Sequence, residues 1–145
     1  LVASALKLTR NQAVEYSNLA RSLERMMDHA YQMAELINDS KDMSISMELP
    51  PIVQLSSWQE ALKQLMINIR TRNSFEIEEC RQKLKSTQHQ ILEFENELIG
   101  DRKLSKHDLF LFRFSESIRR LCAYARDFGE ILLNLKLYDE MIVRN

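Results

Sequence analysis

The scarcity of helix-breaking residues restricts the fold of this chain more than any other feature. Its 145 residues include only two glycines, Gly100 and Gly129, and two adjacent prolines, Pro50 and Pro51. Tight turns between strands usually depend on glycine or proline, and both residues disfavour a helix interior. The sequence therefore predicts long uninterrupted helices and argues against a sheet protein rich in turns. A hydrophobic fraction of 45% over this length is sufficient for one domain, residues 1–145, with its own core.

The first predicted helix covers residues 3–39. Its apolar residues recur at alternating spacings of three and four, which is typical of an amphipathic helix in a bundle. The predicted core positions are Ala13, Tyr16, Ala20, Leu23, Met27, Ala30, Ala34 and Ile37. Leu19, Met26 and Met33 widen this apolar face. We expect an irregular segment at 40–55, because the residue before a proline avoids helical geometry.

Capping patterns predict the starts of the remaining helices. In each pattern, a side-chain oxygen can accept a hydrogen bond from an amide of the first turn, and an acid follows three positions later. The pairs are Ser57 with Glu60, Asn73 with Glu76, and Ser105 with Asp108. They place helices at about 57–72, 74–99 and 106–142, with Gly100 as a C-terminal cap of the third helix.

The last predicted helix carries the same kind of seam as the first. Its core positions are Leu111, Phe114, Ile118, Leu121, Ala125, Phe128, Leu132 and Leu135. Four helices with broad apolar seams and short connections favour an all-α fold, an antiparallel four-helix bundle.

The first and last predicted helices also resemble each other at an offset of 95 residues. The side-chain sizes agree at most core positions: Leu23 corresponds to Ile118, Met27 to Cys122, Ala30 to Ala125 and Ala34 to Gly129. An ancient internal repeat explains this agreement, although shared helical heptads alone produce part of it.

Glu24 and Asp28 form the main candidate site. Residues four apart on a helix share one face and lie about 5–6 Å apart, so two carboxylates there repel each other unless a cation lies between them. They can therefore hold a metal ion, pair with an arginine of a neighbouring helix, or lie on a solvated face. Glu35 and Asp39 repeat the spacing on the same stripe. His29 beside them is either a further ligand or a residue at the boundary of the bundle.

Motifs of several enzyme classes are absent from the sequence. No histidine has a glutamate three positions before it, as di-iron bundles require, and there is no H-E-x-x-H, glycine-rich phosphate loop or G-x-S-x-G. Cys80 and Cys122 form no C-x-x-C pair and favour reduced thiols in the cytoplasm. A net charge of −1 lacks the basic footprint of nucleic-acid binding, and no apolar run is long enough to span a membrane.

The run ARSLERMMDHAYQMAELI, residues 20–37, resembles a helical motif of the PhoU family. The family pattern is close to L-E-R-I-x-D-H-A-x-x-I-A-E, and the matching residues are Leu23, Glu24, Arg25, Asp28, His29, Ala30, Ala34 and Glu35. The resemblance implies part of a fold of two tandem three-helix bundles, with the first two helices missing. The apolar face of residues 3–39 would then have lost neighbours, and the chain would have to dimerise, exchange elements or rearrange to cover it; of these we expect a homodimer.

The resemblance also implies a function. PhoU-like proteins regulate phosphate uptake and phosphate homeostasis by contacting a transporter or sensor kinase component, and they are not known as enzymes. Their E-x-x-x-D motifs can bind iron or zinc, which implies Glu24 and Asp28 as metal ligands. The positions matched to these two residues at the offset of 95 are Arg119 and Ala123, which cannot replace carboxylate ligands. We expect Arg119 and Arg126 to form ion pairs there in place of a metal.

Three alternatives remain open at this level. The chain could be a cytoplasmic accessory domain of another ion transporter or channel, attached to the membrane only indirectly. It could be a plain dimerising helical module. A carboxylate-bridged metalloenzyme is the third alternative, and the missing Glu-x-x-His motifs argue against it.

Overall fold

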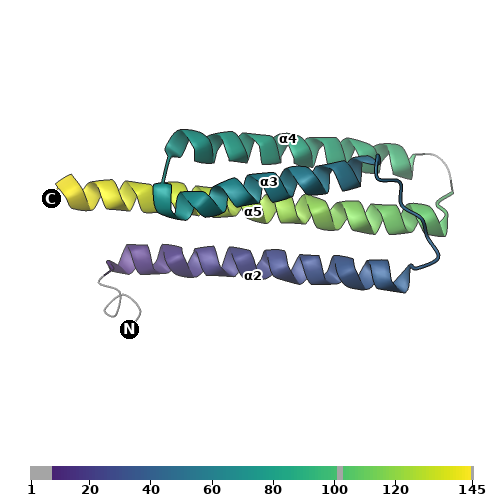
Figure 1. Ribbon diagram of the computed structural model, residues 1–145, viewed down its shortest axis with the longest axis horizontal. Helices are drawn as coiled ribbons and strands as arrows, with labels where there is room; N and C mark the ends of the chain where they lie inside the picture. The colour runs from purple at the N-terminus through teal and green to yellow at the C-terminus, as the bar shows by residue number, and fades with distance from the viewer. Residues whose placement is uncertain (1–7, 101–102, 145) are drawn as a thin grey trace.

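A computed structural model describes residues 8–100 and 103–144. They form four helices: α2 (Arg10–Asp39), α3 (Pro50–Thr71), α4 (Ser74–Ile99) and α5 (Lys106–Arg144), with no strand in these two ranges. The helices lie along a common long axis and alternate in direction (Figure 1). The predicted all-α helical bundle is thus confirmed. None of these helices, so far as they are described, has the length and hydropathy needed to cross a membrane.

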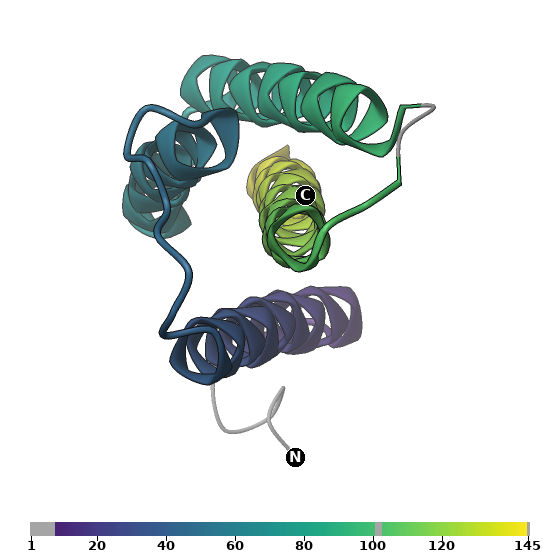
Figure 2. The same cartoon turned by 90° about the vertical axis from the view of Figure 1, so that its right-hand side faces the viewer.

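Helix α5 takes the central position in the bundle. It lies between α2 on one side and the α3–α4 hairpin on the other (Figure 2). Helix α2 packs along α5, and over the described ranges its backbone does not approach α3 or α4. All eight predicted core positions of the last helix are buried, which confirms that seam. They are buried because α5 is the one helix here with neighbours on two opposite sides.

Helix α2 buries a different seam from the one predicted. Its buried residues are Gln12, Leu19, Ser22, Met26, His29 and Met33. Several predicted core positions are exposed instead: Ala20, Met27, Ala30, Ala34 and Ile37. The prediction was wrong because apolar residues cover a wide arc of α2, and only the part of the arc that faces α5 is buried. With α5 alone in contact, the residues expected only to widen the apolar face lie at its centre.

Helix α3 begins at Pro50, not at residue 57. The two prolines occupy its first two positions, where the fixed φ of proline suits a helix and no amide donor is needed. The restriction on the residue before a proline applies to Leu49, which is extended with φ −64° and ψ 141°. The irregular segment therefore ends at residue 49, and Ser57 is no cap: its Oγ donates to the Val53 carbonyl, 3.5 Å away, within the helix.

The other helix ends agree more closely with the sequence. Helix α4 has its predicted bounds, with Asn73 accepting a hydrogen bond from the Glu76 amide at 3.1 Å. Helix α5 starts as predicted at residue 106 and extends two residues further, to Arg144. Helix α2 starts at Arg10, because Thr9 caps it in a reciprocal pair with Gln12. The predicted start at residue 3 lies outside the described residues.

Candidate functional site

Glu24 and Asp28 lie on one exposed side of α2. The helix is continuous from Arg10 to Asp39, so residues four apart share a face. Glu35 and Asp39 are exposed on the same side. By helical periodicity, this side points away from the seam that packs on α5. We call these four residues the acidic ridge.

The described residues place no third ligand beside Glu24 and Asp28. No group of three or more histidine, cysteine, aspartate or glutamate side chains able to hold a metal occurs in that part of the chain. His29 follows Asp28 in sequence but lies on the buried face of α2, about 100° around the helix from Asp28. Zinc sites usually have three or four protein ligands, so the pair alone fits iron or zinc poorly. A metal at Glu24 and Asp28 stays a prediction, and it needs ligands from outside this part of the structure.

The matched positions on α5 carry an ion pair, as expected for Arg119. The Arg119 Nε atom lies 3.3 Å from the Glu95 carboxylate of α4. Glu95 is only 2% exposed, and it also accepts a hydrogen bond from the Ser115 hydroxyl at 3.2 Å. Arg126 differs from the expectation, since its guanidinium donates to the Gln88 amide oxygen at 2.9 Å and not to an acid. The Arg119–Glu95 ion pair therefore joins α5 to α4. It lies at the position of α5 that matches the acidic pair of α2 at the offset of 95 residues.

His29 of α2 packs against α5. Its ring stacks on Tyr124 with the centroids 5.4 Å apart, and the Arg25 guanidinium lies 5.7 Å from the centre of the same Tyr124 ring. Burial has the largest effect on the pKa of His29 and lowers it, and the positive charge of Arg120 lowers it further. The negative charges of Asp28 and Glu116 raise it in part. Of the two readings of His29, the structure supports the residue at the bundle boundary.

A hollow of about 300 Å³ lies between α2 and α5 beside this histidine. We call it the basic hollow. Its lining residues are His29, Gln32, Leu36, Arg113, Glu116, Ser117 and Arg120. The Arg120 Nη2 atom lies 2.7 Å from the Glu116 carboxylate. Sequence reasoning missed this site, although the spacing of residues 113, 116, 117 and 120 on one helix face was available as a signal.

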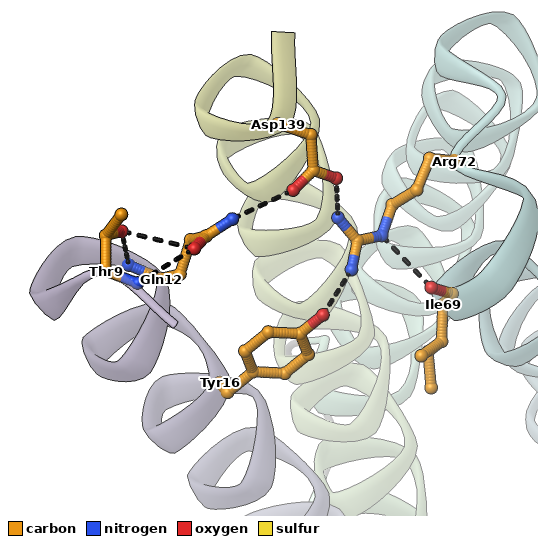
Figure 3. Close-up of polar contacts among 6 residues, drawn as sticks. All are labelled: Thr9, Gln12, Tyr16, Ile69, Arg72 and Asp139. Carbon is orange, nitrogen blue, oxygen red and sulfur yellow. Dashed lines mark hydrogen bonds and ion pairs between the residues drawn. The ribbon is translucent and has the colours of Figure 1, made fainter. Parts of the chain in front are cut away.

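A polar cluster at the other end of the molecule joins three segments (Figure 3). Arg72 follows α3 in the left-handed conformation, with φ 50°. Its guanidinium donates to the Ile69 carbonyl at 3.0 Å, to Asp139 at 2.6 Å and to the Tyr16 hydroxyl at 2.6 Å. Gln12 donates to the other Asp139 oxygen at 3.0 Å. This cluster was not predictable, because its members lie far apart in sequence.

The two cysteines are free and buried, and their reduced state stays a prediction. Burial raises the pKa of Cys122 to about 12. The pKa of Cys80 is also raised, mainly by burial. Burial therefore disfavours the thiolate, which is the reactive form, at both positions.

Comparison with known proteins gives no match: no family model fits the chain, and no curated protein or solved structure is detectably similar to it. The fold and the described sites define an all-α helical bundle with one exposed acidic helix face.

Proposed function

We propose that this chain is a PhoU-like regulator of phosphate uptake that acts by protein–protein contact. In this proposal, the outer side of α2 docks an amphipathic helix of a phosphate transporter or sensor component. The observation that carries the proposal is the exposure of apolar side chains beside the acidic ridge. Met27 is 72% exposed and Tyr31 is 65% exposed.

The exposed apolar side chains form one side of α2. We call this surface the outer flank; its members are Ala20, Met27, Ala30, Tyr31 and Ala34. Exposed apolar residues that are scattered singly need no explanation, but a contiguous row along one helix is typical of a contact surface. Of the described helices only α5 packs on α2, and the five flank residues are exposed, so the flank is available for a partner.

The likeness between α2 and α5 indicates what this surface accommodates. Met27, Ala30 and Ala34 correspond to Cys122, Ala125 and Gly129, which are buried in the bundle. At Gly129 the packing is close: an added Cβ atom would lie 2.8 Å from the Arg81 side chain of α4 and 3.4 Å from Leu65 of α3.

Helix α5 thus uses small residues to accept a helical hairpin. The exposed alanines at positions 30 and 34 leave α2 able to accept a helix at a comparably short distance.

Charge indicates the nature of the partner. On α5, the position matched to Glu24 is Arg119, and α4 meets it with Glu95. On α2 the charge is reversed, and Asp28 adds a second acid. A helix that packs on the outer flank in the same way must therefore carry lysine or arginine where α4 carries glutamate. The acidic ridge favours a partner helix with one basic edge.

Phosphate uptake as the regulated process comes from the motif at residues 20–37. An accessory role on another ion transporter or channel would use the same surface. The homodimer expected from the sequence is the competing occupant of the outer flank, and a second copy there would make the protein the dimerising module considered above. The experiment must separate these outcomes.

The test measures phosphate uptake in a deletion strain of the source organism grown with excess phosphate. We expect uptake to become unrestrained on deletion and to be restored by the wild-type gene. A Glu24→Arg/Asp28→Arg variant and a Met27→Glu variant should fail to restore it. Lys85→Glu on the exposed face of α4 is the matched control and should restore it.

Three results would contradict the proposal. Unchanged uptake after deletion would exclude the phosphate role, and full restoration by the α2 variants would exclude the outer flank. A wild-type dimer that becomes monomeric in Met27→Glu, measured by sedimentation, would assign the flank to a second copy. All four substituted positions are exposed, so the variants should fold, and circular dichroism of each purified variant checks this.

A further inference from the structure

We propose that the basic hollow between α2 and α5 binds a small oxyanion. This inference is independent of the proposed function, because it concerns the side of α2 that carries His29 and not the outer flank. It rests on the donors that line the hollow, on the burial of His29 and on the ion pair between Arg120 and Glu116.

The lining of the hollow is dominated by hydrogen-bond donors. Arg113 and Arg120 contribute guanidinium groups, Ser117 a hydroxyl and Gln32 an amide. Glu116 is the one acid of the lining, so the two arginines leave a net charge of +1 while His29 is neutral. A surface with this balance favours a ligand that carries several acceptor oxygens and a negative charge.

The spacing of the residues directs these donors to one place. Arg113, Ser117 and Arg120 are separated by four and three positions on continuous α5, so they lie on one side of the helix. From α2, His29, Gln32 and Leu36 follow the same three-and-four spacing. Two helix faces that pack along each other therefore enclose the hollow, with an arginine toward each end of its α5 side.

His29 supplies the buried polar group of the site. It is only 8% exposed, and its Nδ1 atom is shielded from solvent without a hydrogen-bond partner in the described part of the chain. A buried unpaired N–H is rarer in folded proteins than a buried unpaired acceptor. We therefore assign the proton of the neutral ring to Nε2. His29 lines the hollow, and in this tautomer Nε2 is its one ring nitrogen that can donate a hydrogen bond.

Glu116 acts as an internal competitor for the ligand. Its carboxylate accepts from Arg120 at 2.7 Å, which is the contact an oxyanion oxygen would make. An oxyanion in the hollow must displace this carboxylate or share the guanidinium with it. Removal of the Glu116 charge should therefore strengthen binding, an effect that a merely structural ion pair would not produce.

The test is a calorimetric and NMR titration of the full chain with inorganic phosphate at pH 7 and low salt. We expect saturable binding that Arg113→Gln and Arg120→Gln each weaken about tenfold, since charge-assisted hydrogen bonds are lost. Glu116→Gln should tighten binding about threefold or more, as removal of a competing acceptor implies. Arg70→Gln, an exposed arginine on α3, is the matched control and should leave binding unchanged.

Parallel titrations identify the source of the oxyanion. Sulfate and acetate test whether tetrahedral geometry is needed, and glycerol phosphate tests whether a phosphate ester fits as well as free phosphate. No saturable signal up to about 10 mM of any of these anions would overturn the proposal, because even a millimolar site would then be largely filled. Equal weakening by Arg70→Gln and Arg113→Gln would also overturn it, as that result indicates nonspecific attraction. Neither result bears on phosphate uptake in the deletion strain.

Discussion

The guanidinium of Arg72 lies 2.6 Å from the carboxylate of Asp139 and joins the end of α3 to α5. The same guanidinium reaches the Tyr16 hydroxyl of α2 (Figure 3), although α2 and α3 make no close backbone contact over the described ranges. The Arg72 side chain is 14% exposed and Asp139 is 48% exposed. One residue outside the helices thus links α2 to the α3–α4 hairpin directly, in addition to the packing of both on α5.

We expect Arg72→Ala to lower the free energy of unfolding by about 1–2 kcal/mol. The loss combines two charge-assisted hydrogen bonds, and the exposure of Asp139 keeps it below the cost of a fully buried pair. Arg72→Gly loses the same contacts but relieves the left-handed backbone, which costs a non-glycine residue about 1 kcal/mol. Urea denaturation should therefore find the glycine variant more stable than the alanine variant. The reverse order would show that φ 50° is not strained here.

Arg119→Glu should destabilise the bundle more strongly, by about 3 kcal/mol. It removes the partner of the buried Glu95 carboxylate and adds a like charge beside it. Arg119→Gln should lie between this variant and the wild type. Arg120→Gln is the control, because its ion pair with Glu116 is exposed and such pairs contribute less than about 1 kcal/mol. A thermal midpoint unchanged in Arg119→Glu would show that the Glu95 contact has no part in stability.

The helices themselves were largely predictable from the sequence. Asn73 and Ser105 marked the starts of α4 and α5 correctly, because a cap acts within a few residues of chain and leaves a local signal. Pro50 and Pro51 misled the prediction of α3. A proline pair can end an extended segment or begin a helix, and only the packing of the following turn decides between them.

The packing of α2 could not be predicted in the same way. Its sequence carries apolar residues over a wide arc, so Leu19 and Ala20 were both candidate core positions. Which of them is buried depends on how many helices surround α2, and this is a tertiary property. The α5 side of the basic hollow had a signal in the spacing of its residues, but its pairing with α2 and the Arg72 cluster depend on contacts between distant segments. The charge reversal between Glu24 and Arg119 was visible from the sequence, and the structure assigns Glu95 as the partner of the arginine.

His29 should make the stability of the protein fall at mildly acidic pH. Burial lowers its pKa below the ordinary value of about 6.5, so the unfolded chain binds a proton there more readily than the folded chain. Stability is therefore unaffected by this group above about pH 7.5 and decreases as the pH falls through 6.5 toward the lowered pKa. His29→Phe keeps an aromatic ring against Tyr124 and removes the titration. Urea denaturation at pH 7.5 and pH 5.5 should give a smaller loss for the variant, and an equal loss would assign the pH dependence to other groups.

The last prediction concerns the metal content of the isolated chain, which tests Glu24 and Asp28 as ligands. Two carboxylates from one exposed helix face supply fewer ligands than the three or four protein groups of a zinc site, so we expect the isolated chain to retain iron or zinc at well below one ion per chain. Elemental analysis after gel filtration, beside a Glu24→Ala/Asp28→Ala variant, measures this directly. Stoichiometric metal that is lost in the double variant would contradict the expectation, and it would show that a second copy or a segment outside the described residues completes the site. Equally low metal in both proteins would leave the acidic ridge as a charged surface for the basic edge of a partner helix.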